Sequence, residues 1–394
     1  MGDSAPSPRE LRPASAAEVA ETVRGADRLL PVGGRSKPGL SLAAGDLPRL
    51  DLSAVRGILA YDPAELTFTA LAGTPVAEVE AALAEHGQFL PFDPPFAEGG
   101  ATLGGAVASG IAGSGRQRYG GVRDFLIGVA LVDGTGALVR GGGKVVKNAA
   151  GFDLPKLMVG SMGTLGVLVE LTFKVFPGPA TRTTLRFDAA GFQQARGWAL
   201  RLAGAPLDLE ALDLAPAAGG GWLALVRLGG PRGSLEARAR RVESLLGVAA
   251  RRIDAEGDAE LWRSCRELEW VGPDRDLVRV PISPRVAPRL EAALAGLAGA
   301  SAADRRYAAG CSVAWIACPR SRTVAELERV LAELGLVGQV VLGTGARAIL
   351  GAIPGAGFAR RLRSALDPGG RFPALDELRG AAPASAIHPA PAEV

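Results

Sequence analysis

Histidine, cysteine and lysine are the scarce residues of this 394-residue chain, and their scarcity excludes several kinds of site. Two histidines and three scattered cysteines, Cys265, Cys311 and Cys318, provide no histidine metal site, no disulfide framework and no iron–sulfur cluster. We therefore expect no metal site and three reduced thiols. Lysine occurs only five times, always in the first half of the chain, whereas the other Lys/Arg positions are arginine.

Charge of one sign and long apolar runs are also missing. Lys and Arg total 44 and Asp and Glu total 41, without a basic cluster, so we expect no nucleic-acid partner. No run of 18 apolar residues occurs, which predicts no membrane-spanning helix. The N-terminal segment MGDSAPSPRELRP lacks the apolar stretch of a secretory signal, and we expect a cytoplasmic protein.

Glycine, in contrast, is abundant and unevenly distributed. The chain contains 54 glycines, of which 19 lie between Gly99 and Gly166 without a G-X-Y period, so a collagen-like chain is excluded. Apolar residues make up 48% of the sequence, which excludes a disordered polar chain. A globular protein with one glycine-rich region generally brings its backbone close to another group there.

The first part of the chain alternates between helix and strand patterns. We expect helices at 16–25 and 75–86, with Thr74 as the cap of the second, and strands at 28–32, 58–61, 66–71 and 164–176. Residues 125–131 and 137–140 read as a hairpin around the turn at 133–136. The sequence Pro177-Gly178-Pro179 then breaks the chain and indicates a domain boundary.

The second part contains the order βαββαβ twice, which is the ferredoxin-like order. The expected elements of the first unit are 183–187, 192–203, 207–214, 222–228, 235–246 and 249–253. Those of the second unit are 277–282, 287–297, 305–309, 312–317, 324–334 and 339–342, after an intervening helix near 260–269. The repeat predicts one wide antiparallel sheet with helices on one face. A last helix is expected at 358–366.

Two of the glycine clusters are suited to a phosphate. The first, PVGGRSKPG at 31–39, presents successive backbone N–H groups, and Arg35 and Lys37 add positive charge. In the second, at 99–113, Thr102 can cap a helix of small residues whose Leu103, Gly104 and Gly105 N–H groups then point outward. The alternatives are an ordinary surface turn for the first cluster and a tightly packed core helix for the second.

The third cluster, at 141–166, carries a more specific pattern. Its segment Asp153-Leu-x-x-Leu-x-x-Gly160-Ser-x-Gly163-Thr-Leu-Gly166 resembles the hallmark of FAD enzymes of the vanillyl-alcohol-oxidase, or PCMH-type, fold. The loop at 33–39 and the segment Thr102-Leu-Gly-Gly105 with Ser109-Gly110 are similar to the two other signatures of that family, in the same order. The segment GGKVVKNAAGFD at 142–153, after VRDF at 122–125, resembles the FAD-binding subunits of glycolate oxidases.

This resemblance implies an α+β fold in several parts. A PCMH-type FAD-binding domain of two α+β subdomains would span residues 1–179, and a ferredoxin-like α+β cap with an antiparallel sheet would span 180–345. Residues 346–380, where LRSALDPGGRF is similar to the family's closing segment, would return to the FAD-binding domain. Residues 381–394 are expected to form a disordered tail.

The resemblance also implies which residues bind FAD. Backbone groups of the first loop and of the second cluster would hold its diphosphate, and others would lie along the rest of the cofactor. The complete set is Gly33, Gly34, Arg35, Ser36, Lys37, Pro94, Thr102, Leu103, Gly104, Gly105, Ser109, Gly110, Gly163 and Val167. Because neither phosphate segment contains the histidine to which some family members attach FAD, we expect non-covalent FAD. The family's glutamate in Gly-Ser-Glu-Gly is Met162 here.

Catalytic residues are the least determined part of the sequence. Oxidation of a 2-hydroxy acid requires a cation for the carboxylate and a base for the hydroxyl proton. Related D-2-hydroxy-acid dehydrogenases use a histidine-rich metal cluster in the cap, where this chain has no histidine. By motif position the candidates are Lys147, Asn148 and Asp153, for each of which a structural or FAD-side role is the alternative.

Three hypotheses for the function follow. The first is an FAD-binding subunit of a glycolate oxidase complex, whose partners would be a sister flavin subunit and an iron–sulfur subunit. Such a complex would oxidise glycolate or a D-2-hydroxy acid to the 2-oxo acid and would sit at the inner face of the membrane through its partners. The second is a stand-alone FAD-dependent D-2-hydroxy-acid dehydrogenase. The third is a flavin-fold scaffold without turnover.

Overall fold

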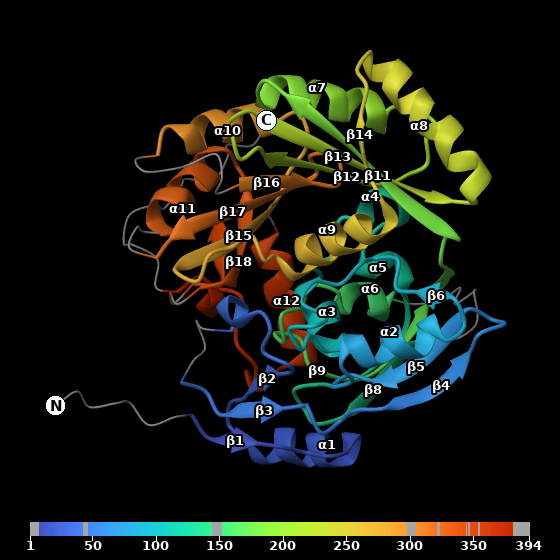
Figure 1. The fold of residues 1–394 in the computed structure, drawn as a ribbon. Helices are drawn as coiled ribbons and strands as arrows, with labels where there is room; N and C mark the ends of the chain where they lie inside the picture. The colour runs from blue at the N-terminus through green and yellow to red at the C-terminus, as the bar shows by residue number, and fades with distance from the viewer. Residues whose placement is uncertain are drawn as a thin grey trace, which may run out of the picture.

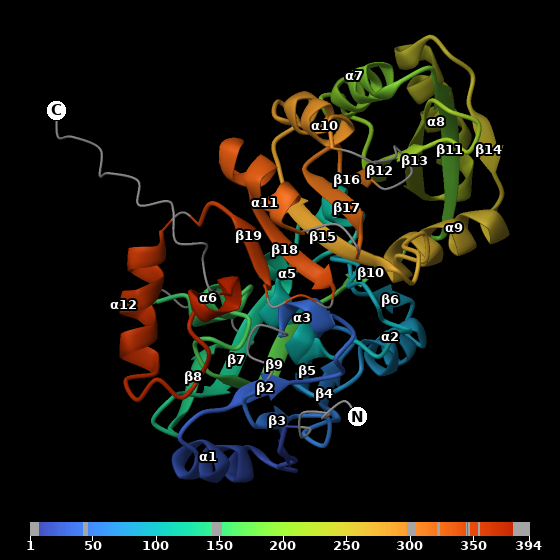
Figure 2. The ribbon, with the colours of Figure 1, turned by 90° about the vertical axis from the view of Figure 1, so that its left-hand side faces the viewer.

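The computed structural model describes residues 8–41, 46–143, 152–297, 305–320, 324–343, 345, 347–353 and 355–380, and its views in Figures 1 and 2 show two layers of structure stacked on each other. The described residues between 8 and 177, here called the N-terminal part, form most of the lower layer of Figure 1. A nine-stranded sheet with its helices forms the upper layer.

A small parallel sheet begins the N-terminal part. Its strand order is β1 (Glu10–Leu11), β3 (Arg49–Asp51) and β2 (Leu30–Val32). Helix α1 (Ala16–Gly25) packs against it through Val19 and Val23, and the Ser15 hydroxyl caps the helix by accepting from the N–H of Glu18. Strand β2 then leads directly into the glycine loop at 33–37.

A five-stranded antiparallel sheet forms the rest of this part. Its order is β4 (Ile58–Asp62), β5 (Thr67–Leu71), β9 (Val167–Lys174), β7 (Leu126–Val132) and β8 (Leu138–Gly142). The further elements are η1 (Pro38–Leu40), α2 (Val76–Ala84), α3 (Leu103–Ser109), α4 (Arg116–Tyr119), α5 (Val122–Phe125), α6 (Leu154–Met158) and the strand pair β6 (Gln88–Phe89) and β10 (Phe176–Pro177). Phe68, Phe92 and Phe173 stack in the core beneath α2 and α3.

Two expected element ends are corrected by local hydrogen bonds. Helix α2 starts at Val76 with Pro75 at the cap position, because the Thr74 hydroxyl donates to the carbonyls of Leu71 (2.7 Å) and Gly57 (3.2 Å) and does not cap the helix. The strand expected at 164–176 begins only at Val167, since Thr164 closes a turn onto the Ser161 carbonyl.

The nine-stranded sheet contains both βαββαβ units. Its order is β14 (Arg251–Ile253), β11 (Thr181–Ala189), β13 (Trp222–Gly230), β12 (Leu209–Pro216), β16 (Arg305–Ala308), β17 (Val313–Pro319), β15 (Arg275–Pro281), β18 (Val337–Leu342) and β19 (Ile349–Gly351). All neighbours pair antiparallel, and the two units join where β12 meets β16 at Leu214 and Tyr307.

The two faces of this sheet are covered differently. Helices α7 (Phe192–Ala203), α8 (Arg232–Leu246), α10 (Ala287–Ala295) and α11 (Val324–Glu333) pack on the outer face, at the top and left in Figure 1. On the inner face, α9 (Ala255–Glu267) covers one end through Trp262. Trp315, Ala317 and Val341 extend the core of the N-terminal part on the same face. The inner face is therefore the one that looks onto the glycine-rich segments.

The last described segment returns to the N-terminal part. After α12 (Ala356–Leu366), the Arg371 carbonyl accepts from the N–H of Leu29 at 2.8 Å, and Phe372 is fully buried beside Val19 and Leu50. The short helix η4 (Glu377–Arg379) follows, and the Leu378 carbonyl accepts from the N–H of Ala348.

Within the described residues, no helix has the length and apolar character needed to cross a membrane.

Candidate functional site

The loop at 33–37 presents a row of backbone donors. In the described part of the chain, none of its five N–H groups donates to a protein acceptor. The loop turns through Arg35, whose φ is +54°. A residue with positive φ next to residues with negative φ aims successive N–H groups at one point, and this arrangement is called an anion-binding nest. The first glycine cluster therefore has the geometry that its sequence predicts.

The two basic side chains of this loop, Arg35 and Lys37, have different surroundings. The Arg35 guanidinium forms ion pairs with Glu10 (2.9 Å) and Asp51 (3.2 Å), so it fastens the loop to the small sheet. Lys37 is buried, its ammonium lies 3.2 Å from the Ser36 hydroxyl, and burial lowers its pKa to about 8. Lys37 is thus the side chain that brings positive charge to the adjoining cavity.

The second cluster corrects one sequence-based expectation. Thr102 caps α3, and its hydroxyl accepts from the N–H of Gly105 at 3.2 Å. The N–H groups of Leu103 and Gly104, however, donate inward to the carbonyls of Thr74 (3.0 Å) and Ala72 (2.7 Å). They do not point outward as expected, because the turn that follows β5 lies against the start of α3. As far as the structure describes the chain, the loop at 33–37, and not α3, supplies the N–H donors without a protein acceptor.

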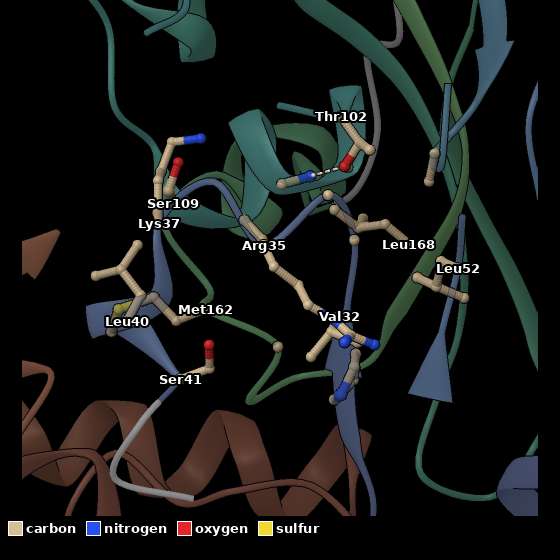
Figure 3. A pocket seen from close by; sticks show the side chains of 18 of the residues that line it. Val32, Arg35, Lys37, Leu40, Ser41, Leu52, Thr102, Ser109, Met162 and Leu168 are labelled. Atoms are coloured by element: carbon tan, nitrogen blue, oxygen red, sulfur yellow. Dashed lines mark hydrogen bonds between the residues drawn. The ribbon is translucent and has the colours of Figure 1, made fainter. Parts of the chain in front are cut away.

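Loop and helix approach each other as closely as glycine permits. A Cβ atom on Gly34 would lie 1.7 Å from the Gly100 carbonyl oxygen, and one on Gly33 would lie 2.4 Å from the Thr102 hydroxyl. Side chains at these positions would force the two segments apart. The glycines thus allow two backbone segments to border one cavity, shown from close by in Figure 3.

This cavity has a volume of about 920 Å³ and lies between the loop, α3 and the turn before β9. Figure 3 shows Lys37 on one side and Leu52 and Leu168 on the opposite side. Its lining consists of Leu30, Pro31, Val32, Gly33, Gly34, Arg35, Ser36, Lys37, Leu40, Ser41, Leu52, Ala72, Thr102, Gly104, Gly105, Ala108, Ser109, Ser161, Met162, Gly163, Gly166 and Leu168. Most of the residues that the resemblance assigned to FAD are among them.

Four of those assigned residues lie outside the lining. Leu103 and Val167 are fully buried core residues, Gly110 ends α3 in the left-handed conformation against Gly160, and Pro94 is buried ahead of α3. Conversely, part of the lining belongs to no sequence motif: it comes from apolar residues of β2 and β9 and from the turn at Ala72. Their only signal in the sequence is that they flank the glycine clusters.

The hallmark segment contributes a polar atom without a partner. The Ser161 hydroxyl is buried in the cavity wall, and no described residue forms a hydrogen bond with it. Met162, with φ of +49°, donates its N–H to the Ala108 carbonyl and packs near Ile349 and Leu378. The position at which the family carries glutamate is therefore an apolar contact here.

Of the remaining candidates, the structure describes Asp153 and His86. Asp153 caps α6 by accepting from the N–H of Lys156 and pairs with the Lys156 ammonium at 2.6 Å, and these bonds lower its pKa. It does not line the cavity, so the structure gives it a capping role. Lys147 and Asn148 lie outside the described residues. His86 is exposed and stacks edge-on against Tyr61. Among the described residues no group of three His, Cys, Asp or Glu side chains could hold a metal ion.

Comparison with known proteins defines the class of this site. Residues 8–142 match the family described as FAD binding domain. The fold matches alkyldihydroxyacetonephosphate synthase with a TM-score of 0.68 over 92% of this chain and 74% of that one, at 17% identity. The chain therefore carries a PCMH-type FAD-binding domain, its α+β fold class is confirmed, and FAD is its cofactor.

Curated relatives narrow the comparison further. The chain is 40% identical to glycolate oxidase subunit GlcE of Escherichia coli K12 over 223 residues, which cover 56% of this chain and 58% of that protein. It is 35% identical to D-2-hydroxyglutarate dehydrogenase of Xanthomonas citri pv. viticola over 42% of this chain and 36% of that protein. Glycolate oxidase subunit GlcD of Bacillus subtilis is 38% identical over 32% of this chain and 27% of that protein. The chain thus spans about half, or less, of the length of the curated relatives it matches.

Proposed function

We propose that this protein is the FAD-binding subunit of a glycolate oxidase complex that oxidises glycolate or a related D-2-hydroxy acid to the 2-oxo acid. The observation that carries the proposal is the cavity of about 920 Å³ bordered by N–H groups that have no described protein acceptor, in a chain that is 40% identical to a glycolate oxidase subunit over 223 residues. Bound FAD supplies the two-electron acceptor for an alcohol carbon; the protein supplies position and electrostatics.

The residues of the cavity fit FAD in three respects. The N–H groups of residues 33–37 suit a diphosphate, and Lys37 adds a positive charge beside them. The buried Ser161 hydroxyl is an unused donor and acceptor. Gly33 and Gly34 let the loop lie against the segment around Thr102, so that both segments border the same cavity. Because the described lining contains no histidine, tyrosine or cysteine, we propose that FAD binds without a covalent bond.

The proposed oxidation also requires partner subunits. Two of the relatives are named as subunits of glycolate oxidase, which supports a complex with a sister flavin subunit. Electrons would leave through an iron–sulfur subunit, because three scattered cysteines in this chain cannot hold a cluster. We propose that the complex lies at the cytoplasmic face of the membrane through these partners.

Purification of the full chain, alone and with its sister subunit, tests this proposal. We expect a yellow protein whose flavin is released by acid precipitation, which also tests for a covalent bond. Glycolate should bleach the flavin of the complex under anaerobic conditions. A colourless chain that does not take up FAD would contradict the proposal. Bleaching of the isolated chain to the same extent and at the same rate would instead identify a stand-alone dehydrogenase, and a complex that binds FAD without any bleaching would indicate a scaffold.

A further inference from the structure

A second cavity lies where the nine-stranded sheet meets the segment that follows α3. It has a volume of about 480 Å³ and is lined by Pro95, Gly113, Ser114, Asp213, Leu214, Ala215, Leu225, Cys265, Arg266, Leu268, Trp270, Arg306 and Trp315. Ser109 lines the FAD cavity, and Gly113 and Ser114 line this one, so a few residues of chain connect the two. Neither the family signatures nor the sequence patterns point to the residues of this second cavity.

Asp213 is the buried anion of this cavity. Only 9% of its surface is exposed, and it forms no ion pair within the described part of the chain. Its carboxylate accepts from the Ser114 hydroxyl and from the N–H of Ala309, at 3.0 Å. These two donors stabilise the charged form, whereas burial raises the pKa of Asp213 to about 6. At neutral pH it is therefore a carboxylate that can still accept a hydrogen bond from the cavity.

Arg306 is the cation of the same cavity. Its guanidinium lies over the ring of Trp270, 4.9 Å from the ring centroid, and burial lowers its pKa. Its Nε atom is buried without a hydrogen-bond partner, and no described carboxylate lies within ion-pair distance of it. The charge of Asp213 and a hydrogen bond with Cys265 offset part of the lowering of the pKa of Arg306. Groups whose pKa is perturbed by burial and by a specific charge in a cavity concentrate at binding sites.

The sheet register brings these two charges together. Leu214 on β12 pairs with Tyr307 on β16, and both side chains belong to the core of the outer face. Side chains alternate along a strand, so Asp213 and Arg306, each one position away, both face inward. They lie diagonally across the junction of the two βαββαβ units. One anion and one cation thus face the same cavity; neither forms a salt bridge with a described residue, and each shifts the pKa of the other.

We propose that this cavity is the binding subsite for a small 2-hydroxy carboxylate, whose carboxylate is bound by Arg306 and whose hydroxyl donates a hydrogen bond to Asp213. The proposal rests on the function proposed above, since it identifies where that substrate class binds. A ligand with both groups on adjacent carbons satisfies the cation and the anion together. Ser114 is the positioning residue, because its hydroxyl orients the Asp213 carboxylate.

The test is calorimetric titration of the flavin-loaded full chain at about pH 8, where Asp213 is ionised, with glycolate and with acetate. Acetate has the carboxylate and lacks the hydroxyl. We expect glycolate to bind at least about tenfold more tightly than acetate, since the hydroxyl contacts a charged group. Quenching of tryptophan fluorescence, from Trp270 and Trp315 in the lining, should accompany binding.

Two variants separate the two contacts. Arg306→Gln should weaken both ligands by about tenfold or more, whereas Asp213→Asn should remove the preference for glycolate and leave acetate bound equally well or better. Arg240→Gln, the same substitution on the exposed face of α8, is the matched control and should bind like the parent. Circular dichroism and flavin content confirm that each variant folds.

Particular results would overturn this proposal. Equal affinity of the parent for glycolate and acetate, no binding of either, or an Arg306→Gln variant that binds like the parent would each do so while FAD remains bound. A chain that takes up no FAD would instead contradict the proposed function. The two failures are therefore distinguishable.

Discussion

Lys37 shows at the scale of one residue how burial prepares a side chain for an anion. Its ammonium has a lowered pKa because burial removes water, while the nearby Glu267 partly offsets that effect. It also lies 5.7 Å from the centroid of the Phe96 ring. A phosphate placed beside it would favour the charged form and raise its pKa again.

The affinity for FAD should therefore depend on pH. Because the pKa of Lys37 is about 8 in the free protein and higher in the complex, affinity is full below pH 8 and falls as the pH rises above it. Titration of the deflavinated protein with FAD from about pH 6.5 to about pH 9.5, followed by flavin fluorescence, measures this. Lys37→Met should bind more weakly with a flatter profile; an unchanged slope in that variant would refute the role of Lys37.

Gly34 lies where the loop and the segment before α3 come closest. In Gly34→Ala the new Cβ would lie 1.7 Å from the Gly100 carbonyl oxygen, so the loop must move away from the segment before α3. We expect a loss of about 1–3 kcal/mol in the free energy of unfolding and reduced flavin content. Gly197→Ala in the middle of α7, where a Cβ meets nothing within 4 Å, is the control and should gain about 0.5–1 kcal/mol. Urea unfolding distinguishes them, and similar stabilities of the two variants would disprove the close approach.

At the scale of the element, α3 shows that a capped helix start need not be an anion site. Its N-terminal donors are satisfied by Thr102 and by the turn at Ala72 to Thr74, so the helix serves to fix the wall of the cavity that we propose binds FAD. A seven-residue helix is too short to be stable alone and depends on its cap and its packing.

Thr102 is the residue on which this element depends. Thr102→Val keeps the shape of the side chain and removes the acceptor of the Gly105 N–H, so we expect a loss of about 1 kcal/mol in the free energy of unfolding. Thr102→Ser keeps the acceptor and should lose clearly less. Denaturant unfolding and flavin retention during gel filtration measure both effects. The capping role would be rejected if the valine variant were as stable as the parent and the serine variant were not.

In the molecule as a whole, the segment after α12 connects regions that are far apart in the sequence. The Arg371 side chain donates to backbone carbonyls at Ala26 (3.1 Å), Arg24 (3.3 Å) and Gly134. Phe372 fills the cluster of Val19, Leu29 and Leu50. The last described segment therefore stabilises the same small sheet that positions the glycine loop.

Phe372 is the fully buried residue of this returning segment. Phe372→Ala removes a fully buried ring and should cost about 3–5 kcal/mol, with earlier release of flavin on heating, because the sheet below the loop loosens. Phe372→Leu keeps most of the apolar volume and should cost less than about 1.5 kcal/mol. Thermal unfolding followed by circular dichroism and flavin fluorescence is the measurement. A small effect of alanine would show that this segment is not part of the supporting core.

Much of the architecture was predictable from the sequence because its signals are local. Periodicity and turn residues indicated both βαββαβ units, and the loop at 33–37 owes its donors to glycines adjacent in the chain. Element ends were less accurate where a residue formed hydrogen bonds outside its own helix or strand, as Thr74 does with Leu71 and Gly57. The sequence motifs identified most of the lining of the cavity that we propose binds FAD, but they missed its apolar wall. The neighbouring sequence of these apolar residues does not distinguish them from other core residues.

The sequence by itself determined the order of the elements, the loop of backbone N–H donors at 33–37 and the FAD-binding class, because each depends on residues that are neighbours in the chain. Only the tertiary structure decided that the N–H groups of Leu103 and Gly104 are used internally, and that Asp213 and Arg306 face one cavity. Those outcomes depend on which turn lies against α3 and on the pairing of β12 with β16. Contacts between segments distant in sequence are set by packing and strand register, which local patterns do not encode.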